Sequence, residues 1–176
     1  ANAQWAARNS PTSLVFDSKM WVIGGNTGSA QNNVWYSTNG ITWTQSTANA
    51  QWQGRTNYTS LVFAPPAGGQ AMWVIGGHDG TDPRNDVWYS SNGATWTQAT
   101  ANAQWAARQR HTSLAFDSKM WVIGGLVVAR VNDVWYSSGS QWLVNHQGTE
   151  NVTYASITNS GCTYDSTNID VNNSTD

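Results

Sequence analysis

The residues with the most evident chemical potential are three Trp–Arg pairs, in each of which the Arg follows the Trp by three positions. The pairs are Trp5 with Arg8, Trp52 with Arg55, and Trp105 with Arg108. Trp and Arg are enriched among the residues that dominate binding interfaces, because they combine a large contact area with directional hydrogen-bond donors. The pairs also fit a packing role, in which each Arg satisfies backbone carbonyls of a neighbouring repeat unit. Both interpretations, ligand contact and packing, stay open from the sequence.

Further polar candidates lie beside the third pair and in one loop of the second repeat unit. They are Arg110, His111, His78, Asp79 and Arg84. Together with the Trp–Arg pairs they form the predicted ligand-binding set. The loops 26–32, 78–85 and 126–131 occupy equivalent places in three repeat units but differ in sequence. Variable loops on a rigid scaffold commonly carry specificity, so we expect these loops to select the ligand.

Metal and catalytic sites have little support. Asp79, Asp82 and Asp86 share a loop region, but their spacing is not that of an EF-hand. The three His residues are scattered along the chain, and no Gly-x-Ser-x-Gly or phosphate-binding loop occurs. The only Glu, Glu150, follows the repeats, which leaves sialidase-type acid/base chemistry without its carboxylates. We therefore predict no metal, no cofactor and no catalytic residue.

The elements that position these residues are set by a repeat. The sequence Met-Trp-Val-Ile-Gly-Gly occupies residues 20–25, 72–77 and 120–125. The equivalent residues Trp5, Trp52 and Trp105 are 47 and 53 positions apart, and segment 64–70 carries most of the extra length as a loop insertion. A repeat of about this length is typical of solenoids and propellers.

Each unit contains four short strand candidates and no helical periodicity. In the first unit they are residues 12–16, 19–24, 33–38 and 42–47, rich in β-branched and aromatic side chains. Asn39-Gly40 between the last two is a hairpin signal. Residues 20–23 are apolar on both faces, so this strand should be covered on both sides. The Gly-Gly pairs, with Gly24, Gly76 and Gly124, should require positive φ or a close backbone approach.

A repeating four-stranded antiparallel sheet covered on both faces is a propeller blade, and the fold class is therefore all-β. The pattern from Arg108 and His111 through residues 121–125 and 133–136 to Trp142 resembles the kelch repeat. Residues 37–43 and 90–96 look like the Asp-box hairpin of sialidase-like propellers, with Asn in place of Asp. The kelch resemblance implies blades at about 1–47, 48–100 and 101–147 and a ligand face built from the loops between blades and after the second strand.

Three blades do not close a ring, because propellers have roughly 4–8 blades. We expect a homodimer that forms a six-bladed ring, with a larger ring or a longer repeat protein as alternatives. The apolar loop 126–129 should be buried or lie in a subunit contact, whereas 78–84 should stay exposed. Residues 148–176 form a polar tail or a partial blade.

Composition limits the partners. Charged residues make up 10% of the chain and the net charge is −2, which does not favour nucleic acid, and no apolar run is long enough for membrane insertion. The polar residues are mostly Asn, Thr, Ser and Gln and not Lys and Glu, which favours an extracellular or cell-surface location, although the single Cys162 argues weakly against it. Because Cys162 lies outside the repeats, the repeats contain no Tyr–Cys pair for a copper site like that of galactose oxidase, which carries kelch-like blades.

The predicted function is a non-catalytic module that binds a protein or a glycan through its loop face. A structural or self-assembling repeat module is the alternative, and an enzyme of glycan metabolism comes third.

Overall fold

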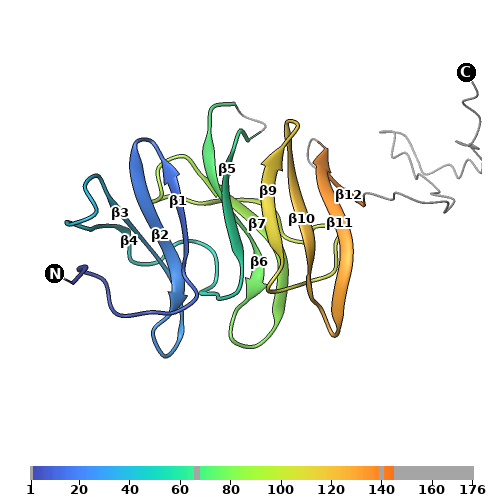
Figure 1. Ribbon diagram of the computed structural model, residues 1–176, viewed down its shortest axis with the longest axis horizontal. Coiled ribbons are helices and arrows are strands. Elements are labelled where there is room, and N and C mark those ends of the chain that lie inside the picture. The colour runs from blue at the N-terminus through green and yellow to red at the C-terminus, as the bar shows by residue number, and fades with distance from the viewer. Residues whose placement is uncertain (1, 66–67, 139–140, 145–176) are drawn as a thin grey trace, which may run out of the picture. The chain divides into compact units, whose positions relative to one another are not determined.

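The computed structural model describes residues 2–65, 68–138 and 141–144, all within one compact unit, Ala1–Asn145. These residues form three four-stranded antiparallel sheets (Figure 1), and no helix long and apolar enough to cross a membrane occurs among them. Sheet 1 contains β1 (Thr12–Phe16), β2 (Lys19–Asn26), β3 (Ala30–Ser37) and β4 (Thr44–Thr47). Sheet 2 contains β5 (Thr59–Phe63), β6 (Ala71–His78), β7 (Pro83–Ser90) and β8 (Thr97–Thr100). Sheet 3 contains β9 (Thr112–Phe116), β10 (Lys119–Leu126), β11 (Arg130–Ser138) and β12 (Gln141–Val144).

The all-β class and the four-stranded antiparallel sheets confirm the fold predicted from the repeat. In every sheet the strands pair in chain order, so each sheet is a simple meander. The predicted first strand is reproduced residue for residue, and the second runs two residues past Gly24 because a bulge there lets the pairing with β3 continue.

The last strand of sheet 1 begins at Thr44, two residues later than predicted. The reason is the turn before it, in which Asn39 Oδ1 accepts hydrogen bonds from the amides of Ile41 and Thr42, both 2.9 Å. Ser37 Oγ accepts from the Gly40 amide at 2.9 Å. The turn that Asn39-Gly40 predicts is therefore longer than a two-residue hairpin. Ser90 and Asn92 repeat it in sheet 2.

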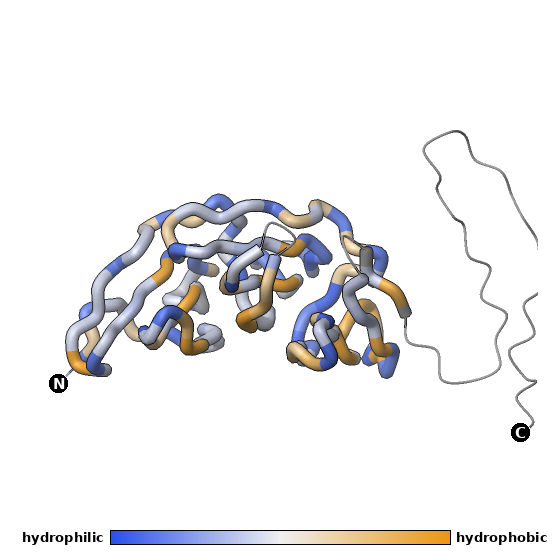
Figure 2. The backbone as a smooth tube through the Cα atoms, turned by 90° about the horizontal axis from the view of Figure 1, so that it is seen from above, coloured by the Kyte–Doolittle hydropathy of each residue, from blue (hydrophilic) through white to orange (hydrophobic). Residues whose placement is uncertain are grey.

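The three sheets pack in chain order through two apolar clusters, and β5 lies beside both β1 and β9. Figure 2 shows hydrophobic segments recurring in all three sheets. The first cluster joins sheets 1 and 2 and contains Trp21, Ile23, Val34, Ala50, Trp52, Tyr58, Met72, Val74 and Trp96. The second joins sheets 2 and 3 and contains Leu61, Trp73, Ile75, Val87, Ala103, Trp105, Met120, Val122 and Trp142. Adjacent sheets thus bury their facing side chains against one another.

The predicted burial of the Met-Trp-Val-Ile strand on both faces is confirmed for the central sheet. In β6, Met72 and Val74 pack toward sheet 1, while Trp73 and Ile75 pack toward sheet 3, and all four are buried. In β2 the equivalent Met20 is 39% exposed, because no described residue covers that side of sheet 1 as sheet 1 covers Met72. Double-sided burial therefore depends on having a neighbouring sheet on each side.

The Gly-Gly pair that ends this strand has both properties expected of it. Gly76 has φ +54° and Gly77 has φ +100°. A Cβ on Gly76 would lie 3.1 Å from Arg84 O and 3.1 Å from His111 Cε1. A Cβ on Gly77 would clash with Tyr58 Cβ and lie 2.9 Å from Thr56 O. The connection between sheets 1 and 2 therefore crosses directly over Gly77, where only glycine fits.

Replacing Gly77 by Ala should reduce the free energy of unfolding by about 2 to 5 kcal/mol, through backbone strain plus the clash with residues 56 and 58. Gly80→Ala is the matched control, because Gly80 has φ +102° but nothing within 4 Å of its Cβ position. Its cost should be about 1 to 2 kcal/mol from strain alone. Urea unfolding measures both. Equal losses would show that the close approach contributes nothing.

Candidate functional site

The connections between sheets and the loops after the second strands meet at one edge of the molecule, here called the connection face. Four isolated bridges join them: Asn9 with Asn26, Thr56 with His78, Arg84 with Arg108, and Gln109 with Leu126. The common location of these segments is the one expected for a four-stranded meander. It brings most of the predicted ligand-binding residues to the same edge.

Two of the three arginines of the Trp–Arg pairs, Arg55 and Arg108, are fully buried at this edge. Arg55 Nη1 donates to Gly76 O at 3.0 Å, and its guanidinium makes a bidentate pair with Asp86 at 2.6 and 2.8 Å. Arg108 does the same with Gly124 O at 2.8 Å and with Asp133 at 2.6 and 2.8 Å. Bidentate pairing satisfies a planar guanidinium well, which lets it lie in the interior.

The Trp members of these pairs lie beneath the arginines. The Arg55 guanidinium carbon is 5.7 Å from the ring centroid of Trp52, and Arg108 is 5.7 Å from that of Trp105. Each Trp also makes an edge-to-face contact with a Trp of its own sheet, Trp96 or Trp142. The side chains of these two pairs are therefore buried in packing contacts and present no surface to a ligand. The pairs are Trp52 with Arg55 and Trp105 with Arg108.

The first Trp–Arg pair has the same geometry with less cover. Arg8 Nη1 donates to Gly24 O at 2.8 Å and to Asn33 Oδ1 at 2.6 Å, so Asn33 stands where sheets 2 and 3 have Asp. Trp5 makes the equivalent edge-to-face contact with Trp43, and both rings are partly exposed. Of the three pairs, only this one keeps part of its surface accessible.

The loop after β6 is not fully exposed, which corrects the prediction for residues 78–84. Asp79 is buried because it organises the loop: its Oδ1 accepts hydrogen bonds from the amides of Thr81 and Asp82, both 2.8 Å. Its Oδ2 pairs with Arg84, whose Nε lies 2.7 Å away. Burial opposes ionisation, but the amides of residues 82 and 81 and the Arg84 guanidinium outweigh it and lower the pKa of Asp79 to about 2. The Asp79 carboxylate can thus be buried in its charged form because it is fully hydrogen-bonded.

His111 is also buried, at the junction of sheets 2 and 3. Its Nε2 lies 3.0 Å from Thr59 Oγ1, and its Nδ1 is buried with no partner among the described residues. Burial, reinforced by the positive charge of Arg108, lowers the pKa of His111 to about 4. At neutral pH His111 is therefore an uncharged packing residue.

The exposed polar residues of the connection face come from segments that differ between repeats. Arg110 is exposed at φ +57°, and its amide donates to Asn57 O at 2.8 Å. Arg84 is partly exposed and donates to Gln53 Oε1 at 3.3 Å. His78, Thr81 and Asp82 complete the accessible part of the same loop. These residues, rather than the buried Trp–Arg pairs, form the accessible surface at the junction of sheets 2 and 3.

The apolar loop of sheet 3 is not buried by the described residues. Val128 is 98% exposed, and Leu126 and Val127 are partly exposed. Burial within the chain is therefore wrong for Val128, and a subunit contact stays a prediction. The reason is that the loop projects beyond the strands, as do the tips of its two equivalents, which carry Gly28 and Gly80.

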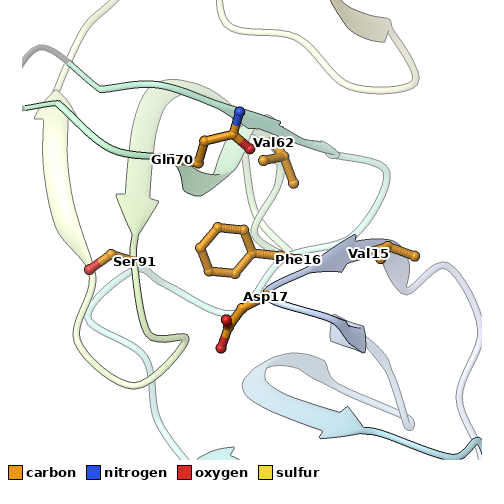
Figure 3. Close-up of a pocket in the computed structure, with 6 residues that line it drawn as sticks. All are labelled: Val15, Phe16, Asp17, Val62, Gln70 and Ser91. Atoms are coloured by element: carbon orange, nitrogen blue, oxygen red, sulfur yellow. The ribbon is translucent and has the colours of Figure 1, made fainter.

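A hollow that the sequence did not indicate lies at the opposite edge, beside the β1–β2 hairpin. It has a volume of about 550 Å³ and is lined by Val15, Phe16, Asp17, Val62, Gln70 and Ser91. Figure 3 shows the Phe16 ring central among these residues, which come from sheets 1 and 2. Val15 and Val62 are equivalent positions of the repeat, but nothing in the sequence brings them together with Asp17, Gln70 and Ser91, so only the packing of the two sheets could reveal the hollow.

A search of the described residues finds no group of three or more His, Cys, Asp or Glu side chains placed to hold a metal ion. Neither a scan of the sequence against protein-family models nor a search of curated proteins finds a match.

The buried Arg55–Asp86 pair should be important for stability. Arg55→Met should cost about 3 to 5 kcal/mol, because it leaves the largely buried Asp86 carboxylate unpaired. Arg8→Met is the matched control and should cost about 1 kcal/mol, since its partner Asn33 is neutral. Urea unfolding measures both, and a similar loss in the two variants would contradict this account.

Acid should destabilise the fold through His111. The unfolded imidazole takes up a proton near its ordinary pKa of 6.5, whereas the folded one does so only near 4. The unfolded state therefore binds more protons in this window, and stability is complete above about pH 6.5 and falls as the pH drops toward 4. The expected loss is on the order of 2 to 3 kcal/mol.

The control is His111→Tyr, since Tyr58 occupies the equivalent place between sheets 1 and 2. Urea unfolding between pH 7.5 and 4.5 should show a shallower decline for this variant. An identical decline would assign the acid sensitivity to other groups.

Proposed function

We propose that this chain is a non-catalytic, kelch-like binding module that recognises a protein ligand through the connection face. The observation that carries the proposal is that the recurring residues of that face are buried, whereas the accessible residues differ between repeat units. Residues that recur between repeat units, such as Arg55 and Arg108, are used in packing, whereas residues found in one unit only, such as Arg110 and Arg84, are at least partly accessible. Non-recurring side chains on a recurring scaffold are a typical arrangement for recognition.

The accessible loop is held in one conformation before any ligand arrives. Asp79 fixes the amides of Thr81 and Asp82 and the side chain of Arg84. A loop that is already ordered loses less conformational entropy on binding, so more of the contact energy appears as affinity. This supports residues 78–84 as a recognition element.

The chemistry of the surface favours an acidic protein segment. Arg110 is exposed and Arg84 is partly exposed, and arginine binds carboxylates with good geometry. Glycans are commonly held by stacking on exposed aromatic rings, but of the three equivalent Trp residues at this face Trp52 and Trp105 are buried and only Trp5 is partly exposed. A glycan ligand is therefore the less favoured form of the proposal, and an extracellular or cell-surface location remains part of it.

Arg110→Asn tests the site directly, because Asn57 occupies the equivalent position with φ +54° and the variant should keep the backbone. On arrays of extracellular proteins and of glycans, we expect the wild type to bind a protein with an acidic segment. The variant should bind that protein at least about tenfold more weakly.

Lys119→Asn is the matched control, since it removes one positive charge from the opposite edge and should leave the affinity unchanged. Equal affinity of the Arg110→Asn variant and the wild type would contradict the proposed site. Binding to glycans alone would replace the ligand class.

A further inference from the structure

Sheet 3 has an apolar face that no described residue covers, here called the C face. It consists of Leu114, Phe116, Trp121, Ile123, Val134 and Tyr136, which the strand register places on one side of the sheet. Leu114 is 43% and Phe116 is 68% exposed. Solvent-exposed apolar surface of this kind commonly marks an interaction site.

The equivalent faces of sheets 1 and 2 show what such a surface is built to contact. In sheet 1, Trp21, Ile23 and Val34 are buried against the following sheet. In sheet 2, Leu61, Trp73 and Ile75 are buried against the following sheet in the same way. The residue types at these positions are the same as on the C face. The C face is therefore a third copy of a surface that is covered twice inside the chain.

The complementary surface lies at the other end of the described chain, on the outer side of sheet 1, where no described sheet covers it. This N face consists of Trp5, Met20 and Trp43, which are at least partly exposed, and of Val22, which is 9% exposed. Its equivalents Trp52, Met72, Val74 and Trp96 cover sheet 1, and Trp105, Met120, Val122 and Trp142 cover sheet 2. Both halves of the internal interface thus recur as surfaces that no described sheet covers.

We propose that the N face of one copy of this chain docks on the C face of a second copy, with the contacts that join adjacent sheets within the chain. The surface repeats an interface that occurs twice inside the same molecule, which identifies the occupant as another copy. Two chains contribute six sheets, a number within the 4–8 blades of closed propellers, whereas three chains would exceed it. Two head-to-tail contacts then close the ring.

A glycine gives this docking a specific fit. Within the chain, Gly93 in the turn of sheet 2 lies flat on Trp21 of sheet 1, where a Cβ would be 2.6 Å from Trp21 Cη2. The equivalent glycine of the N face is Gly40, with φ +74° and only the flexible end of Met20 within 4 Å of its Cβ position. In the docked pair, Gly40 lies on Trp121 of the second copy.

One contact differs from the internal interfaces. Tyr58 OH donates to Ile23 O at 2.5 Å across the first interface, and His111 takes the equivalent position in the second. On the N face this position is Pro11, which has no donor to offer. The contact between copies therefore depends more on apolar packing and shape than the contacts inside the chain do.

Sedimentation of the full chain tests the proposal, and we expect a species of twice 19.2 kDa. Met20→Glu on the N face and Leu114→Glu on the C face should each weaken the association at least about a hundredfold, because each would bury an unpaired charge at the contact. Val128→Glu separates this docking from a subunit contact through the apolar loop 126–129, since Val128 is 98% exposed and the equivalent tips at Gly28 and Gly80 stay exposed beside internal interfaces. It should leave the mass unchanged.

Mixing the two monomeric variants distinguishes head-to-tail docking from other dimers. The Leu114→Glu chain keeps its N face and the Met20→Glu chain keeps its C face, so the mixture should regain a two-chain species through one intact contact. Near-ultraviolet circular dichroism confirms that each variant is folded. A monomeric wild type, a Met20→Glu variant that stays dimeric, or a mixture that stays monomeric would each overturn the proposal.

Discussion

The buried guanidinium groups of Arg55 and Arg108 hold the connections between sheets against the sheet that follows. A buried cation is costly unless it is paired and hydrogen-bonded, so each arginine needs a carboxylate and a backbone carbonyl at fixed positions. Asp86 and Gly76 O supply them for Arg55. This requirement determines where the connection crosses the end of β6, and the crossing is close enough to exclude a side chain at Gly77.

The same interaction determines which side chains of the connection face remain accessible. Because Trp52 and Arg55 are used to fix the connection, they cannot also contact a ligand without opening the interface between sheets. The accessible side chains come instead from residues that the packing does not need, such as Arg110, and from a loop that has its own internal support, as Asp79 provides. The Trp–Arg pairs, which were the most evident candidates in the sequence, are therefore not the most accessible residues of this face.

Repetition also determines what the ends of the array present. Each sheet carries one face suited to the preceding sheet and one suited to the following sheet, and the pairing of Trp52 with Trp21 in a common cluster illustrates the match. The first and last sheets therefore display the two complementary faces. An array of three such sheets has matching apolar ends as a direct consequence of its repeat.

The sequence alone determined the number and order of the strands in each sheet and the need for glycine at the Gly-Gly pairs, because these depend on local propensity and period; the ends of the strands depend on bulges and turns that the structure defines. Only the tertiary structure decided which equivalent residues are buried. Trp5 and Trp52 both end an Ala-Asn-Ala-Gln-Trp segment, yet Trp52 is 1% exposed and Trp5 is partly exposed, because a preceding sheet covers only Trp52. The burial of Asp79 was also decided by the folded structure, but for another reason. Its desolvation is offset by Arg84 and by two amides that come within hydrogen-bonding distance only when the loop folds back.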